Sequence, residues 1–225
     1  SWTFVLRDGV TFSNGQPLTS ADVKFSIDQN RKQEAPFYFL DSVITHIQTP
    51  NTKTVVITTK VPWAPLPSTM ALFVNSIVPA NYGGKSVDAF GQAPVGSGPF
   101  AFDHWTKGSE LKLVKNAKYW HTGKPMLDSV NFTVVADSNT RSTQLAGRQI
   151  QINEYPPYST IKALQSQPQL KVDPFPSSEV DYLSMNTVRK PFNDVNVRRA
   201  IAQAVDKAAI RSAVLFGSGD IATTF

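Results

Sequence analysis

Histidine is rare and cysteine is absent in this chain of 225 residues, so two residue types often used in catalysis are scarce. Its 3 histidines are His46, His104 and His121, and none has a partner at a metal-ligand spacing such as His-x-x-x-His. His46 lies in an alternating segment typical of a strand, and His121 follows Trp120 in a predicted turn. We therefore interpret both as surface or packed histidines and expect no metal site.

Two glycine–serine turns could be mistaken for nucleophile motifs. A nucleophile elbow needs Gly-x-Ser-x-Gly between a strand and a helix, but Gly96-Ser97-Gly98 is followed by Pro99 and a predicted strand. Gly217-Ser218-Gly219 is predicted to be a tight turn after a helix. Acidic residues are dispersed, without a pair suited to glycoside hydrolysis. We predict no catalytic residue and no cofactor. The enzyme alternative is a secreted hydrolase, which alanine replacement of Ser97 or His104 would test.

Aromatic residues outside regular structure favour a binding function instead. A cleft for a small molecule needs apolar and aromatic walls with a few polar groups. Phe37, Tyr38 and Phe39 form a dense patch, and Trp63 lies in a proline-rich segment. For Phe37 and Phe39 packing against the core is the favoured interpretation. Tyr38 and Trp63 carry polar groups, and for them core packing and ligand contact are equally supported.

The composition narrows the class of protein. The net charge is +5, but the 22 Lys and Arg residues are scattered and form no basic stripe with stacking aromatics, so we expect no nucleic-acid partner. The absence of cysteine excludes a disulfide scaffold and thiol chemistry. The sequence contains no run of about 20 apolar residues, so it predicts no membrane-spanning helix.

The sequence pattern of residues 1–95 predicts that they form a smaller α+β subdomain. Residues 3–6 alternate as a strand, and Thr19 or Ser20 begins a helix that runs to about residue 33. Residues 43–48 and 54–59 alternate on either side of a turn, which predicts a hairpin.

The second part, residues 96–225, predicts an α/β core subdomain in which helices alternate with strands. Strands are expected at 100–105, 111–115, 129–135, 150–152, 171–175 and 180–185. In the strand around 181–186, Tyr182 and Ser184 share one face. Asp137, Asp194 and Asp206 are placed to begin helices, and Gly147 to end the first of them.

Three stretches, in order, carry a resemblance to a known family. The first is FVLRDGVTFSNGQPLTSADV at 4–23; the second is GSGPF at 96–100 with NAKYW at 116–120 and GKP at 123–125; the third is PFNDVNVRRAIAQAVD at 191–206. Over nearly its whole length the chain resembles the family 5 solute-binding proteins of ABC importers, which carry peptides, nickel complexes and related small ligands.

The resemblance implies an α/β mixed fold of the periplasmic-binding-protein type II kind, as the first lobe only: a mixed sheet flanked by helices plus the smaller subdomain. Relatives are longer, so the chain is expected to be an internal fragment without the second lobe. In such proteins the ligand lies between the lobes. The positions that would approach it from this lobe are Tyr38, Asn75, Tyr182 and Ser184, to which the aromatic pattern adds Trp63.

The function implied by the resemblance is capture of a small solute, expected to be a peptide, for delivery to an ABC permease. No reaction would be catalysed. We expect a monomer located outside the cytoplasm, either periplasmic or lipid-anchored on the outer face of the membrane. A second alternative to the solute-binding function is a module that binds peptides or proteins through exposed aromatics. Such a module is expected to self-associate, which light scattering would detect.

Overall fold

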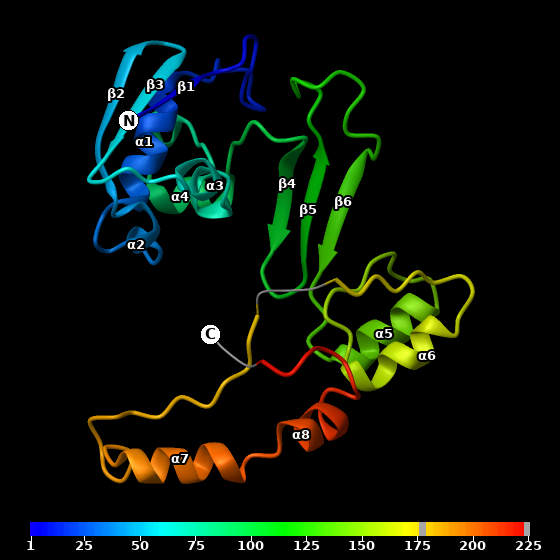
Figure 1. Cartoon of the computed structure of the whole chain (residues 1–225). Helices are drawn as coiled ribbons and strands as arrows, with labels where there is room; N and C mark the ends of the chain where they lie inside the picture. The colour runs from blue at the N-terminus through cyan, green and yellow to red at the C-terminus, as the bar shows by residue number, and fades with distance from the viewer. Residues whose placement is uncertain (176–178, 223–225) are drawn as a thin grey trace. The chain divides into compact units, whose positions relative to one another are not determined.

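The computed structural model describes residues 1–175 and 179–222 (Figure 1). It divides into two compact units, an N-terminal unit, Ser1–Val134, and a C-terminal unit, Val135–Phe225. The predicted subdomain boundary at residue 95 falls inside the N-terminal unit, between its two sheets, and stays a prediction.

The first sheet of the N-terminal unit is antiparallel, with strand order β1-β3-β2. Its strands are β1 Trp2–Val5, β2 Ile44–Asn51 and β3 Thr54–Thr59. Helix α1, Ser20–Asn30, packs against β2 and β3 (Figure 1). The predicted strand, helix and hairpin are all confirmed, with small shifts at their ends.

Alternation along β3 explains where the core lies. Val55 and Ile57 are 0% and 1% exposed, whereas Val56 between them is only partly buried. Successive residues of a strand point to opposite faces, so one face of the sheet is apolar. The buried cluster on that face consists of Ile27, Ile44, Ile47, Val55, Ile57 and Leu66.

Asp22 fixes the start of α1. Its Oδ2 accepts hydrogen bonds from the backbone N–H of Thr19 at 2.7 Å and from the Thr19 hydroxyl at 2.8 Å. Its Oδ1 accepts from the backbone N–H of Ala80 at 2.8 Å. A carboxylate in the first turn also complements the helix dipole. Asp22 thus forms a capping box with Thr19, one of the two residues predicted to begin the helix, and also holds the distant loop at Ala80.

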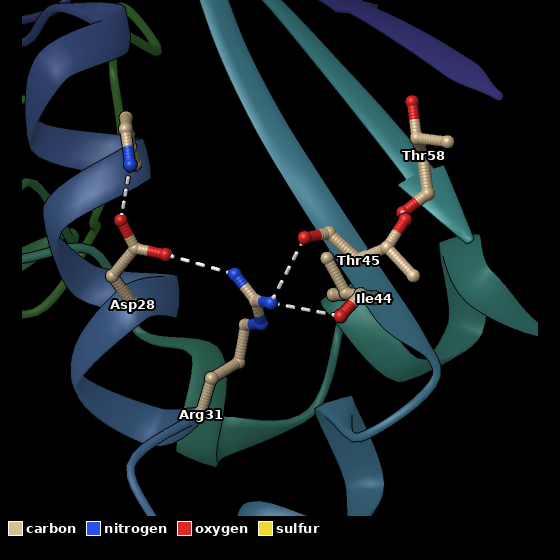
Figure 2. A network of polar contacts seen from close by, with 6 residues as sticks. Asp28, Arg31, Ile44, Thr45 and Thr58 are labelled. Carbon is tan, nitrogen blue, oxygen red and sulfur yellow. Dashed lines mark hydrogen bonds and ion pairs between the residues drawn. The ribbon is translucent and has the colours of Figure 1, made fainter. Parts of the chain in front are cut away.

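Arg31 ties the other end of α1 to strand β2 (Figure 2). Its guanidinium donates to Asp28 Oδ1 at 3.0 Å and to the carbonyl oxygen of Ile44 at 2.8 Å, with a longer bond of 3.4 Å to the Thr45 carbonyl. These bonds fix the end of the helix against the start of the strand.

One short helix, α2, lies between α1 and β2, and the other short helices connect the first sheet to the second. The segment of Trp63 has no regular structure before α3, and Pro67 occupies the first turn of that helix, where proline needs no hydrogen bond. The elements are α2 Tyr38–Asp41, α3 Leu66–Met70, η1 Phe73–Asn75, η2 Ala80–Gly84 and α4 Val87–Gln92.

The second sheet is an antiparallel meander of order β4-β5-β6. Its strands are β4 Phe100–Thr106, β5 Glu110–Lys115 and β6 Ser129–Thr133. The predicted strands at 100–105, 111–115 and 129–135 are therefore confirmed. Asn116 closes the end of β5, because its amide donates to the Gly98 carbonyl at 2.8 Å and its backbone N–H donates to the Pro99 carbonyl at 2.9 Å. This contact joins residues 96–100 and 116–120, two parts of the second sequence stretch singled out above.

In the described part of the C-terminal unit, the regular elements are all helices, and three predicted strands are wrong. Residues 150–152, 171–175 and 180–185 form no strand there. A strand needs a backbone partner for its N–H and C=O groups, and alternation alone does not supply one. The helices are α5 Ser138–Ala146, η3 Tyr158–Thr160, α6 Ile161–Gln165, α7 Val195–Ala204 and α8 Lys207–Ala213. Within the described part of the chain, no helix combines the length and apolar content that crossing a bilayer requires.

Aspartate side chains begin three of these helices, as predicted. Asp137 accepts from the backbone N–H of Thr140 at 2.7 Å, Asp194 from Asn196 at 2.7 Å, and Asp206 from Ala209 at 2.9 Å. Each bond satisfies one donor that the first turn would otherwise leave unpaired.

We expect Asp206→Ala to destabilise α8 by about 1 kcal/mol, because the Ala209 N–H loses its acceptor. Asp206→Asn should cost less than half as much, since its amide oxygen still accepts. Loss of helical circular dichroism on heating would measure both. Equal melting of the two variants would contradict the capping role.

Candidate ligand-binding site

The predicted ligand contact Tyr38 lies in an exposed group of rings on α2 and η1. Phe37, Tyr38, Phe39 and Phe73, here called the aromatic cluster, are 42%, 43%, 58% and 75% exposed. The Phe37 ring meets Phe73 edge to face at 5.6 Å between centroids, and Tyr38 meets Phe39 in the same way at 6.5 Å. Phe37 and Phe39 are therefore partly exposed at the surface, and their packing against the core, the interpretation favoured from sequence, stays a prediction.

A buried polar pair lies between α2 and η1. Asp41 is 0% exposed, and its Oδ1 accepts from the Asn75 side-chain amide at 3.2 Å. The same amide donates to the Thr69 carbonyl at 3.1 Å, and the Asn75 Oδ1 accepts from Asn30 at 3.1 Å. Asn75 is 4% exposed, so its amide holds together the elements that present the aromatic cluster. Sequence reasoning singled out Asn75 as a ligand contact but overlooked Asp41.

Burial raises the pKa of Asp41 above its ordinary value of 3.8, against the opposing effects of the Asn75 hydrogen bond and the Arg31 charge. The second carboxyl oxygen, Oδ2, has no hydrogen-bond partner. A buried carboxylate oxygen without a donor disfavours the charged form.

This pKa predicts the sign of a pH effect on stability. Just above pH 3.8 the folded chain holds the Asp41 proton that the unfolded chain has lost, so this group's contribution to stability falls as pH rises through the raised pKa. Asp41→Asn lacks the titration, and its carbonyl oxygen can still accept from Asn75. Urea unfolding from about pH 4 to about pH 7 should show wild-type stability declining relative to the variant. Parallel curves would contradict the raised pKa.

Trp63 and Tyr182 are exposed, as ligand contacts must be before binding. Trp63 is 40% exposed, just before α3 in the N-terminal unit. Among the described residues, no ring contact joins Trp63 to the aromatic cluster. Tyr182 is 67% exposed, and it lies with the exposed Ser184 in the C-terminal unit. Because 180–185 form no strand, the argument that Tyr182 and Ser184 share one strand face is wrong.

His104 is held between two carboxylates across the β4–β5 hairpin. Its Nδ1 lies 2.9 Å from Asp103 Oδ2 and its Nε2 lies 3.0 Å from Glu110 Oε1, with Lys112 Nζ 3.7 Å from the same Asp103 oxygen. A register shift between Phe102 and His104 lets the neighbouring Asp103 and His104 side chains meet. The hydrogen bond to Glu110, and then that to Asp103, raises the pKa of His104. Both ring nitrogens thus face carboxylates, and neither is free to activate a serine. No cluster suited to a metal ion is found among the described residues.

The sequence matches one protein-family model from end to end. That family is the bacterial extracellular solute-binding proteins, family 5 (the model named family 5 Middle), and the match covers residues 1–225. The chain belongs to this family. The expected family and its mixed α/β fold are therefore confirmed.

Curated family 5 relatives are similar to the chain over almost all of its length. A probable D,D-dipeptide-binding periplasmic protein, DdpA of Escherichia coli (strain K12), is 31% identical over 97% of the chain and 43% of DdpA. The glutathione-binding protein GsiB of the same strain is 30% identical over 99% of the chain and 44% of GsiB. The chain thus spans less than half the length of these relatives.

Solved structures of periplasmic binding proteins show the same fold. The binding protein AgaA of A. tumefaciens R10, in complex with agropinic acid, superposes with a TM-score of 0.83 at 33% identity, over 97% of this chain and 44% of AgaA. The periplasmic binding protein DppA of Helicobacter pylori, in complex with the peptide STSA, gives a TM-score of 0.76 at 27% identity, over 96% of this chain and 46% of DppA.

Proposed function

We propose that these residues are part of a longer parent protein that captures a small solute outside the cytoplasm and delivers it to an ABC permease. The observation that carries the proposal is the family 5 match along the entire chain. DdpA is described as periplasmic and GsiB as glutathione-binding. Both descriptions support a solute-binding function outside the cytoplasm for the parent protein.

A peptide or a peptide-like molecule is the proposed ligand. DdpA is described as binding D,D-dipeptides, GsiB as binding glutathione, and DppA was solved with a tetrapeptide. These ligands share amide groups and free carboxylates. AgaA, solved with agropinic acid, broadens the class to other small acids.

The proposed contacts from this chain are Tyr38 and Trp63 in the N-terminal unit and Tyr182 and Ser184 in the C-terminal unit. Exposed aromatic rings offer large contact areas at small entropic cost. Asn75 is proposed to act indirectly, because its buried amide positions α2 and η1. Ligand binding between this lobe and a second lobe would shift the equilibrium between the open and closed states by the ligand's preference for the closed state.

The parent protein is proposed to be a monomeric carrier that catalyses no reaction. The hydrolase alternative placed Ser97 and His104 in a reaction, but both nitrogens of His104 already face carboxylates. An activity screen on Ser97→Ala and His104→Ala remains its test. The interaction-module alternative rests on the exposed aromatic cluster and predicts self-association in light scattering.

Isothermal calorimetry with the parent protein tests the proposal. The probes are glutathione, a D,D-dipeptide, the peptide Ser-Thr-Ser-Ala and agropinic acid. We expect binding of at least one probe at a 1:1 ratio. Absence of heat with every probe, together with hydrolysis of any of them, would overturn it in favour of an enzyme.

A further inference from the structure

A cavity in the N-terminal unit lies outside the proposed ligand site. Its volume is about 270 Å³, and it is formed by the segment after β1, the segment leading into α1 and the turn between β2 and β3. Two cationic side chains, Arg7 and Lys53, line it together with the hydroxyl-bearing residues Thr11, Thr19 and Thr52.

Strand pairing brings the two cations to one wall of the cavity. Val5 pairs with Thr54 at the end of β1, and the backbone N–H of Leu6 then donates to the Lys53 carbonyl at 2.8 Å. Residues directly after β1 and directly before β3 are therefore neighbours. Both side chains line the cavity, so an anion bound there would be attracted by both positive charges.

Arg7 is oriented and retains its donors. Its Cζ lies over the Trp120 ring, 4.2 Å from the ring centroid, and this cation–π contact orients the guanidinium. The N–H groups lie in the guanidinium plane and point outward from its edge. Among the described residues, Arg7 has no acidic partner and no hydrogen-bond acceptor.

Lys53 has a partner that an anion can replace. Its ammonium pairs with Asp8, whose side chain is 83% exposed, and the Lys53 side chain is itself 56% exposed. Exposed ion pairs contribute little to stability. Asp8 can therefore move into water when another anion reaches Lys53.

The start of α1 does not supply the recognition. The Ser20 N–H already donates to the Thr52 carbonyl at 2.8 Å, and Asp22 occupies the first turn of the helix. The Thr19 hydroxyl is also engaged, because it donates to Asp22. The anion would instead meet Arg7 and Lys53, with the hydroxyls of Thr11 and Thr52 as additional donors. Because a water molecule occupies about 30 Å³ in the liquid, the cavity has room for a tetrahedral oxyanion and several waters.

We propose that this cavity binds a small oxyanion of the phosphate, sulfate or carboxylate type, with Arg7 as the main ligand and Lys53 as the second. Such groups match the planar fork of an arginine, which can bond two oxygens at once. A free anion and the phosphate of a lipid headgroup present the same chemistry.

Titration with inorganic phosphate at constant ionic strength, followed by amide NMR of the 225-residue chain, tests this site. We expect saturable shifts at Thr11, Thr52 and Lys53. Arg7→Gln should weaken binding about tenfold, because a charge-assisted, two-point contact is lost. Arg7→Lys should recover only part of the affinity. Asp8→Asn should strengthen binding, since it removes the competing carboxylate.

Lys60→Gln is the matched control, because Lys60 follows β3 at the end opposite Lys53 and carries the same charge. Equal weakening by Lys60→Gln and Arg7→Gln, or shifts spread over the whole unit, would overturn the proposal. Vesicles with and without phosphatidylglycerol separate the sources. Arg7-dependent binding to the anionic vesicles alone indicates a headgroup, and Arg7-dependent binding of phosphate alone indicates a free anion. The absence of both overturns the site.

Discussion

Ile57→Ala is expected to destabilise the N-terminal unit by about 2–5 kcal/mol, the range for large-to-small substitutions at fully packed sites. Ile57 is 1% exposed at the centre of β3, with Trp2 opposite it on β1 and Ile47 opposite it on β2. The substitution leaves a cavity where three strands and α1 meet. Urea denaturation followed by tryptophan fluorescence would measure the change, and Ile57→Val should cost about 0.5–1.5 kcal/mol.

Val5→Ala is the control for this substitution. Val5 lies on β1 of the same sheet but is 74% exposed, so its loss should change stability by less than about 0.5 kcal/mol. Similar costs for Ile57→Ala and Val5→Ala would mean that the β1-β3-β2 sheet does not carry the core described here.

Tyr38→Ala in the parent protein is expected to weaken ligand binding by about 5- to 30-fold, as truncation of an aromatic contact residue commonly does. The expectation rests on the proposed function, and Trp63→Ala should behave similarly. Both rings are about two-fifths exposed, with Tyr38 43% and Trp63 40% accessible. Their loss should therefore leave the unfolding midpoint nearly unchanged. Calorimetry with the best-bound probe would provide the affinities.

Tyr158→Ala offers a comparison of the same chemistry. Tyr158 is 48% exposed in η3, outside the proposed contacts. The Tyr158→Ala variant should bind the probe with the same affinity as the wild type. Unchanged affinity in both Tyr38→Ala and Trp63→Ala would remove these rings from the site, while the family membership would stand.

Local sequence signals predict the N-terminal unit well. The alternation at 54–59, the cap before Ser20 and the turn at Gly108 each act within a few residues. The observed strands β1 to β6 and helix α1 follow them closely. The aspartates before α5, α7 and α8 were predictable for the same reason, since a capping bond spans only two or three residues.

The sequence could not predict features that depend on distant partners. Asp41 and Asn75 meet across 34 positions, and nothing near Asp41 indicates that its carboxyl is fully buried. Residues 180–185 alternate like a strand but have no strand partner in the described chain. The exposed positions of Phe37 and Phe39 likewise depend on how α2 packs against η1.

The central claim is that the 225-residue chain forms one side of a two-sided ligand site. Calorimetry of the parent protein and of the 225-residue chain, with the same probe and buffer, tests it most directly. We predict 1:1 binding by the parent protein and binding at least about 100-fold weaker by the chain alone, because the contacts of the second lobe are lost. Equally tight, stoichiometric binding by the chain alone would contradict the claim.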